Sequence, residues 1–339
     1  MSEARSGDAS PPPVVASPAD WRGAALQDHP ERWLHRLTGR ELAELEVAVA
    51  QVRPAPGDRR QLTTVKLRLP ALAPTVANWL ERLDHGPGVV LVRGLPLDRW
   101  SHDDATLAYW LIGRLLGDPV PQNAAGELLV DVRDDGASAA NHDTRRYRTR
   151  AGLAFHTDGA DIIGLLCLRA ARSGGVSRIC SSVHVYHEVV RRRPDLAPLL
   201  FTPYHHHAHG QFGPDGPRTF QYPIVTLGDA TFRMFLLSWY IRHAAEDFPD
   251  VARLTPPQLE LLDLLEAIPL EDGVALDMSF QPGDMQFLKN SVILHARTEY
   301  EDFEEPDAKR HLLRLWLSAH QFRDGDDFLR RGIDATRRA

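Results

Sequence analysis

Cysteine is scarce in this chain of 339 residues, in which only Cys167 and Cys180 occur. Neither stands in a Cys-x-x-Cys or other ligand spacing, so the sequence excludes a disulfide-rich secreted scaffold and a cysteine-ligated zinc site. Two isolated cysteines are typical of a reducing compartment. We expect both to be small buried residues with free thiols, and a disulfide between them is the less favoured alternative.

Long apolar runs and an excess of positive charge are absent as well. No segment has the apolar length of a membrane span, and the N-terminus lacks the basic opening and apolar core of a signal peptide. The formal net charge of −7 provides no basic surface for a phosphate backbone. No glycine-rich phosphate loop precedes a helix, which argues against a P-loop or dinucleotide-binding fold. We expect a cytoplasmic protein that binds neither nucleic acid nor membrane.

The composition is that of a globular protein, with 43% apolar and 25% charged residues, and the length allows a large core. Residues 1–19 are rich in Ser, Ala and Pro, and we expect them to form a disordered tail. We expect residues 20–339 to form a single catalytic domain, with an α/β elaboration at its N-terminal end and a core at about 88–320. Two small domains are the alternative.

Hydrophobic periodicity predicts an α+β chain with a mainly β core. Helical spacing and capping residues predict helices at 38–52, 76–83, 101–117, 183–192 and 256–267. Short apolar or alternating runs predict strands at 88–94, 128–132, 162–168, 177–182, 285–288, 292–295 and 311–318. Many short strands separated by Gly, Pro, Asp and Asn favour a sandwich or a barrel.

The segment Phe155-His156-Thr157-Asp158 places an imidazole and a carboxylate two residues apart. On a strand both side chains leave the same face, so both can bind one ion. His295 follows the apolar run 292–294 and is the candidate third ligand. Two histidines and one carboxylate form the facial triad of non-haem iron oxygenases, which leaves coordination positions open.

Alone, this pattern is weak, because the chain has 16 histidines. His102-Asp103-Asp104 repeats it in the first turn of a predicted helix, where the helix dipole favours Asp, and we interpret that copy as a solvated helix start. A lone histidine such as His295 at a strand end is usually a core or rim residue. Its assignment as a ligand therefore depends on the residues that follow it.

The segment 310–318 supports the assignment. As a strand, it places Arg310 and Arg314 on one face and an apolar row on the other. A guanidinium inside a barrel is costly unless a carboxylate meets it, and its planar fork suits a bidentate carboxylate. A partly exposed strand is the alternative, and a helix would also place both arginines on one face.

Together these residues resemble the taurine dioxygenase (TauD/TfdA) family of Fe(II)- and 2-oxoglutarate-dependent oxygenases, from about Gly88 to Ser318. The resemblance rests on Val-Arg-Gly-Leu-Pro at 92–96, Phe-His-Thr-Asp at 155–158, Ser-Gly-Gly-Val-Ser at 173–177, Pro-Gly-Asp at 282–284 and the stretch 295–314. It implies a double-stranded β-helix, a relative of the jelly roll, with flanking helices.

The resemblance also implies the ligands and cofactors. Fe(II) is bound by His156, Asp158 and His295, and 2-oxoglutarate and O2 are the cosubstrates. Arg314 is expected to pair with the far carboxylate of 2-oxoglutarate. Ser177, in place of the commoner Thr, is expected to bind the same carboxylate. Arg310 contacts either the other end of the cosubstrate or the substrate.

The expected reaction is hydroxylation of a small organic molecule, with release of succinate and CO2. Desaturation, epoxidation and cyclisation use the same ligands and stay open. Related halogenases carry a small residue where Asp158 stands, so halogenation is disfavoured. A catalytically silent barrel used for binding is the non-enzyme alternative, and the complete ligand set argues against it.

The substrate is not specified by these motifs. Gly152 stands nearest to the position where taurine-binding members carry Asn, which argues against a sulfonate. The candidate substrate-binding residues are Asn141, His142, His207 and Gln122. The basic segment after His142 forms either a lid over an acidic substrate or a solvated loop, and we favour the loop.

The histidine-rich segment 204–210 has three interpretations, which are a polar loop, a group of substrate contacts and a second metal site. We favour the polar loop. Trp239 and Tyr240 lie in an apolar segment and are expected in the core. We expect a homo-oligomer, either a dimer or a tetramer.

Overall fold

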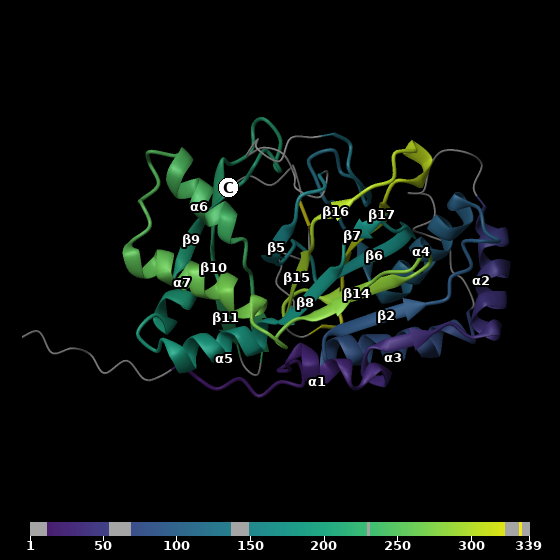
Figure 1. The fold of residues 1–339 in the computed structure, drawn as a ribbon, viewed down its shortest axis with the longest axis horizontal. Helices are drawn as coiled ribbons and strands as arrows, with labels where there is room; N and C mark the ends of the chain where they lie inside the picture. Colours follow the sequence, from purple (N-terminus) through teal and green to yellow (C-terminus); the bar gives the residue numbers. More distant parts are fainter. Residues whose placement is uncertain (1–11, 54–68, 137–148, 229–230, 323–331, 334–339) are drawn as a thin grey trace, which may run out of the picture.

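The computed structural model describes residues 12–53, 69–136, 149–228, 231–322 and 332–333, and two β-sheets form its centre (Figure 1). The larger sheet consists of β1 (Leu34–Arg36), β2 (Val89–Arg93), β3 (Asp118–Pro119), β4 (Leu129–Val132), β6 (Ile162–Arg169), β14 (Met285–Lys289) and β17 (His311–Ser318). Its order is β1-β2-β14-β6-β17-β3, and β4 also pairs with β17. Every residue of β17 is buried, as expected for a strand covered on both faces.

The smaller sheet consists of β5 (Leu153–His156), β8 (Ser177–Ser181), β13 (Leu276–Met278) and β15 (Ile293–Arg297). Its order is β13-β8-β15-β5. The chain passes repeatedly between the two sheets, from β5 to β6 to β8 and again from β13 to β14 to β15. This winding is that of a double-stranded β-helix, so the predicted fold is confirmed.

At one end of the molecule, α3 (Leu72–His85) and α4 (His102–Leu116) pack against the larger sheet (Figure 1). A further helix, α2 (Gly39–Val52), packs on α4. Thr38 and Glu41 form the predicted capping box of α2. A Cβ atom on Gly113 would lie 2.3 Å from Leu315 Cδ2, so this glycine allows α4 to lie directly on β17.

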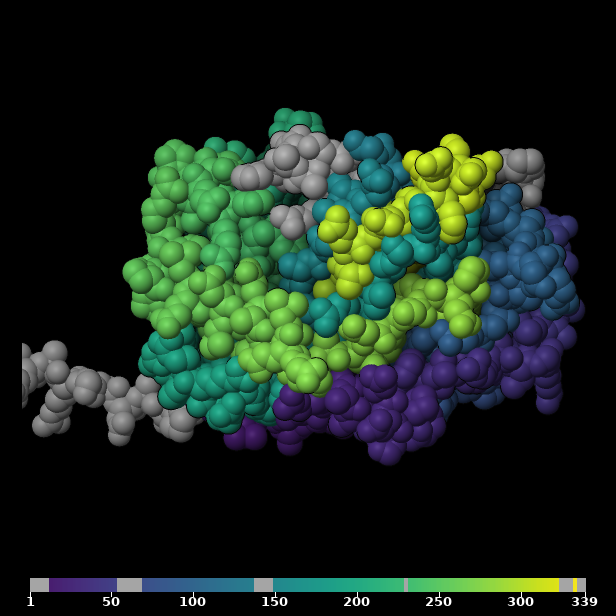
Figure 2. All heavy atoms as spheres, in the orientation of Figure 1, coloured from purple at the N-terminus to yellow at the C-terminus, as the bar shows by residue number. Residues whose placement is uncertain are grey.

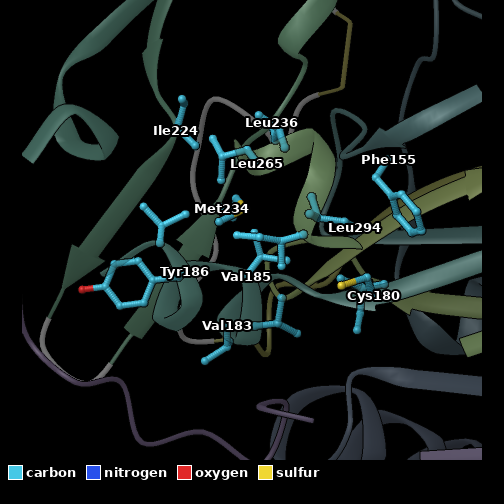
Figure 3. Close-up of a cluster of buried hydrophobic side chains, with 14 of the residues drawn as sticks. Phe155, Cys180, Val183, Val185, Tyr186, Ile224, Met234, Leu236, Leu265 and Leu294 are labelled. Carbon is cyan, nitrogen blue, oxygen red and sulfur yellow. The ribbon is translucent and has the colours of Figure 1, made fainter. Parts of the chain in front are cut away.

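The other end is formed by three helices and two hairpins, which Figure 2 shows in green and teal opposite the purple and blue N-terminal part. The elements are α5 (Ser182–Arg192), α6 (Ser238–Asp247), α7 (Pro256–Ala267), β9 (Pro203–His207) with β10 (Thr219–Pro223), and β11 (Val225–Gly228) with β12 (Thr231–Met234). In Figure 3, Val183, Tyr186, Met234, Leu265 and Leu294 meet in one buried cluster. The helices α5 and α7 were predicted, whereas α6 and the hairpins were not.

Contacts between the N-terminal segment and the rest of the protein begin before residue 20, where the sequence predicts the domain to start. The hydroxyl of Tyr186 donates to the carbonyl of Pro13 at 2.8 Å, and the hydroxyl of Ser181 donates to that of Ala19 at 2.5 Å. Ala19 is buried and leads into α1 (Gly23–Gln27). The expectation of a disordered tail over 1–19 is therefore wrong for residues 12–19, and residues 1–11 lie outside the described part. The single-domain expectation for 20–339 stays a prediction.

Short elements complete the described chain. β7 (Ser173–Gly174) pairs with β16 (Tyr300–Glu301), and 3-10 turns lie at Pro30–Arg32, Ala197–Phe201, Ile268–Leu270 and Pro306–Ala308. Cys167 and Cys180 are free and buried, as predicted. Burial raises the pKa of Cys167 to about 12, with smaller contributions from nearby charges. Among the described residues, no helix has the length and apolar character needed to cross a membrane.

Candidate metal and cosubstrate site

Three predicted ligands converge on the inner side of the smaller sheet. His156 ends β5 and is the register partner of His295 on β15, while Asp158 lies in the loop after β5. His156 Nε2 lies 3.8 Å from Asp158 Oδ1, and His295 Nε2 lies 3.7 Å from Asp158 Oδ2. One ligand atom from each residue lies within 4.8 Å of the other two. This spacing suits nitrogen and oxygen donors that surround one ion at about 2.0–2.2 Å each.

The protonation states also fit a divalent metal. His156 Nδ1 lies 2.9 Å from the carbonyl of Ala154, so Nδ1 carries the proton and Nε2 presents its lone pair. Burial and the neighbouring His295 lower the pKa of His156 to about 3, which keeps the ring neutral at pH 7. Burial alone would raise the pKa of Asp158, but Arg314 and the two histidines hold it well below its ordinary value. Two of the three candidate ligands are therefore in the deprotonated form that metal ligation requires.

The two oxygens of Asp158 have different surroundings. Oδ2 accepts hydrogen bonds from Arg314 Nη1 at 3.3 Å and from Trp316 Nε1 at 3.1 Å. Both donors lie on the inner face of β17, as the alternating pattern of that strand predicts. Oδ1 faces His156 instead. The two oxygens thus lie next to different histidines, and Oδ2, beside His295, also accepts the two hydrogen bonds from β17.

Asn290 fixes the backbone of the same aspartate. Its Oδ1 accepts from the N–H of Asp158 at 2.9 Å, and its Nδ2 donates to the carbonyl of Asp158 at 2.7 Å. Thr157, one residue earlier, forms two hydrogen bonds with the backbone of Leu236. Asn290 is buried. The sequence analysis missed it, because a single Asn after a strand carries no signal for this contact.

A cavity adjoins the three candidate ligands and extends away from them between the sheets. Its lining includes Ser177 and Arg310 as well as Arg314, so the structure brings the three predicted cosubstrate residues together. The remaining wall is largely apolar, with Val132, Leu153, Ile163, Leu165, Phe280 and Leu312. Such a cavity suits a short aliphatic chain with an anionic group at its end.

The two arginines occupy different depths. Arg314 lies at the metal end, where it contacts Asp158. Arg310 is four residues away along the strand, about 13 Å at about 3.3 Å per residue. It is 4% exposed, and its Nη1 has no hydrogen-bond partner among the described residues. An unpaired buried guanidinium donor is costly, so the end of the cavity near Arg310 suits an anion.

Comparison with known proteins agrees with this geometry. The model of the taurine catabolism dioxygenase TauD, TfdA family matches residues 51–316. The chain belongs to this family. The members of the TauD/TfdA family are Fe(II)- and 2-oxoglutarate-dependent oxygenases, and this chain is such an enzyme, with Fe(II), 2-oxoglutarate and O2 as its cofactors and cosubstrates.

Individual relatives cover most of the chain. FR-33289 synthase of Streptomyces rubellomurinus (strain ATCC 31215) is 29% identical over 311 residues, which cover 89% of this chain and 90% of that protein. Taurine hydroxylase-like protein SAT17 of Stachybotrys chartarum (strain CBS 109288 / IBT 7711) is 27% identical and covers 82% of this chain and 73% of its own. The structure of asparagine oxygenase with Fe(II), 3-hydroxyasparagine and succinate aligns with a TM-score of 0.63 at 20% identity, over 84% of this chain and 94% of that one. This last likeness supports the fold.

The predicted substrate residues have other surroundings in this TauD/TfdA member. Gln122 is fully buried, and its Oε1 accepts from Arg314 Nε at 2.8 Å while its Nε2 donates to the carbonyls of Arg314 and Leu128. It therefore holds Arg314 and is not among the residues that line the cavity, and its role in substrate binding stays a prediction. His207 lies on β9 with its Nε2 3.7 Å from Asp247, away from the lining residues. Asn141 and His142 lie outside the described residues.

Trp239 was expected in the core, but it is half-buried on α6 and lies edge-on to His156, with ring centroids 5.3 Å apart. No signal in the sequence pointed to this contact, because α6 itself was not predicted. Within the described ranges, His156, Asp158 and His295 are the one group of three ligands close enough to hold an ion. The histidines of 204–210 and His102 do not form a second one.

Proposed function

We propose that this enzyme hydroxylates a C–H bond of a small organic molecule, with Fe(II) held by His156, Asp158 and His295. The observation that carries the proposal is the convergence of two imidazoles and a carboxylate at one end of a cavity whose other end holds a buried guanidinium. When bound, iron and 2-oxoglutarate supply the activation of O2, which is coupled to formation of succinate and CO2. The side chains position these groups and exclude water.

We assign the far carboxylate of 2-oxoglutarate to Arg310 and Ser177, whereas the sequence analysis gave the leading role to Arg314. Two facts support the change. Arg314 is already engaged by Asp158 and Gln122 at the metal end, whereas Arg310 has a donor without a partner among the described residues. Ser177 lines the cavity, and its Oγ donates to Gln286 Oε1 at 3.2 Å. Rotation about the Cβ–Oγ bond would redirect that proton to a carboxylate in the cavity.

We assign to Arg314 the control of charge and orientation at Asp158. With Oδ2 held by Arg314 and Trp316, Oδ1 is the oxygen that would be available to a metal. Binding through one oxygen would leave the open positions that the facial triad provides for cosubstrate and O2. Arg314 lines the cavity at the end with the metal ligands, where it could also contact an anionic group of the substrate.

The names of the relatives support hydroxylation over other outcomes. SAT17 is described as taurine hydroxylase-like, and asparagine oxygenase was crystallised with a hydroxylated amino acid and succinate. Asp158 fills the position that a halogenase needs to vacate. Desaturation and cyclisation use the same ligands, and identification of the product by mass spectrometry distinguishes them.

Two broader expectations remain as proposals. The buried free thiols Cys167 and Cys180 support a reducing compartment such as the cytoplasm. Assembly into a dimer or tetramer is tested by light scattering of the purified protein, and a monomeric mass would contradict it.

The site assignment is tested by spectroscopy and kinetics. Anaerobic addition of Fe(II) and 2-oxoglutarate should produce a weak visible charge-transfer band, and His156→Ala should abolish it. Arg310→Leu should raise the 2-oxoglutarate KM by at least ten-fold because a charge-assisted bond is lost. Arg314→Leu should weaken Fe(II) binding more than 2-oxoglutarate binding. A band that survives in His156→Ala, or equal effects of the two arginine variants, would contradict the assignment.

A further inference from the structure

A second buried guanidinium lies beside Arg310. Arg297 is on β15, two residues after His295, so both side chains leave the same face of the strand. It is 7% exposed and lines the same cavity as Arg310. Its register partner on β8 is Ser177, and side chains of paired residues lie next to each other on one face. Arg297, Arg310 and Ser177 therefore share the end of the cavity away from the metal ligands.

The hydrogen bonds of Arg297 use only part of its guanidinium. Nη2 donates to the carbonyls of Thr149 and Ala151, at 2.8 and 2.6 Å. Nε has no hydrogen-bond partner among the described residues, as is the case for Arg310 Nη1. Two buried, charged donors without acceptors thus lie at the same end of the cavity, where each would cost free energy unless an anion binds there.

The aromatic ring of Tyr300 lies against both cations. The guanidinium carbons of Arg297 and Arg310 lie 4.9 and 5.0 Å from its centroid, within the range of cation–π attraction. The backbone N–H of Arg310 donates to Asp302, but neither guanidinium forms an ion pair with a carboxylate of the described residues. Burial and Arg310 lower the pKa of Arg297 to about 10, which leaves it charged at pH 7. The carboxylates of Asp302 and Asp134 attract Arg297, and that of Asp302 attracts Arg310, but only without direct contact.

We propose that Arg297 is a third binding residue for the far carboxylate of 2-oxoglutarate, with its Nε donating to the oxygen that Arg310 leaves free. This inference rests on the proposed function, which places that carboxylate at Arg310 and Ser177. A carboxylate has about four lone-pair sites, enough for both guanidiniums and the hydroxyl. Two cations at this end make the cavity selective for 2-oxo acids that carry a second carboxylate.

The test separates binding of the far carboxylate from a purely structural role. Arg297→Lys keeps a cation that can reach the carbonyls of Thr149 and Ala151 but removes the Nε donor. The control is Arg178→Lys on β8, where Arg178 pairs with Asp277 at the surface. Dissociation constants are measured anaerobically on the Fe(II)-loaded protein, for 2-oxoglutarate and for 2-oxopentanoate, in which a methyl group replaces the far carboxylate. Melting temperatures and Fe(II) affinities are recorded for each variant.

Arg297→Lys should weaken 2-oxoglutarate binding by about ten-fold, the worth of one charge-assisted hydrogen bond, and leave 2-oxopentanoate binding unchanged. Arg178→Lys should change neither. If Arg297→Lys is too unstable to measure, Arg297→Gln serves in its place, because it keeps a donor for a carbonyl and loses the charge. An unchanged 2-oxoglutarate affinity, or equal losses for both acids, would overturn the proposal and leave Arg297 as a support for residues 149–151. Absence of 2-oxoglutarate binding in the unmodified protein would instead refute the proposed function.

Discussion

His206 should make the stability of this protein depend on pH in a predictable way. It lies on β9 and is fully buried, with its ring stacked on Phe220 at a centroid distance of 5.0 Å and tilted against Phe235. Its Nδ1 donates to the carbonyl of Tyr204 at 3.0 Å. Burial lowers its pKa to about 3, although backbone hydrogen bonds oppose the shift. The folded protein therefore holds His206 neutral, where the unfolded chain would titrate at about 6.5.

The sign and size of the effect follow from linkage. Because the folded pKa is the lower one, the unfolded state binds the proton first as pH falls, so the stability contributed by a neutral His206 is complete above about pH 6.5 and is lost below it. The loss continues until the folded pKa near 3 is reached. Between pH 7 and pH 5 the unfolded state gains about 2 kcal/mol from this single group, at 1.36 kcal/mol per unit of pKa difference.

The assay is urea unfolding of the metal-free protein at pH 5, 6 and 7, compared with His206→Asn. Asparagine can donate to Tyr204 and does not titrate. The difference in the free energy of unfolding between the wild type and His206→Asn is measured at each pH. From pH 7 to pH 5 the wild type should lose about 2 kcal/mol relative to the variant, because the variant lacks the titrating group. His205→Asn, at the half-buried neighbouring position, controls for changes to the hairpin. Parallel pH profiles of the wild type and His206→Asn would refute the reasoning.

Two residues that hold other side chains of the site in position give two further predictions. Asn290→Ala removes both hydrogen bonds to the backbone of Asp158, and Fe(II) affinity should fall by about 10- to 100-fold; an unchanged titration of the apoprotein with Fe(II) would contradict this. Gln122→Leu leaves Arg314 Nε without its acceptor, so the free energy of unfolding in urea should fall by about 1–3 kcal/mol. Ala124→Leu, at an exposed position close to Gln122 in the chain, is the control and should change stability by less.

The sequence predicted which side chains converge because part of the signal is local. His156 ends β5 and Asp158 follows two positions later, and β17 alternates between apolar residues that face α4 and residues that face the cavity. Periodicity of this kind depends on the backbone alone. The same rule places Arg297 on the face of His295, so Arg297 could have been found from its spacing and was missed.

The remaining site residues could not be predicted, because their roles depend on contacts between distant segments. Gln122 meets Arg314 across 192 positions, and Asn290 meets Asp158 across 132. Neither residue type carries a pattern that specifies its partner. Trp239 reaches His156 only because α6 packs beside the site, and the position of α6 in the fold is not encoded in its own sequence. Which of the two arginines lies nearer to the metal ligands depends on how β17 is aligned with its neighbouring strands. Strand alternation predicts the face on which a side chain lies but not its distance from those ligands.

The position of Arg314 explains why a buried cation beside a metal site can favour metal binding. A guanidinium 3.3 Å from Asp158 Oδ2 competes with the metal for the carboxylate, and if it engaged both oxygens the ligand would be lost. Gln122 prevents this by accepting from Nε, which turns one edge of the guanidinium away from Asp158, while Trp316 supplies the second donor to Oδ2. The charge of Arg314 thus keeps Asp158 ionised, and the contacts to Oδ2 would leave Oδ1 for iron. A cation is tolerable at this end of the cavity because Asp158 offsets its charge and because a bound dianionic cosubstrate would add negative charge.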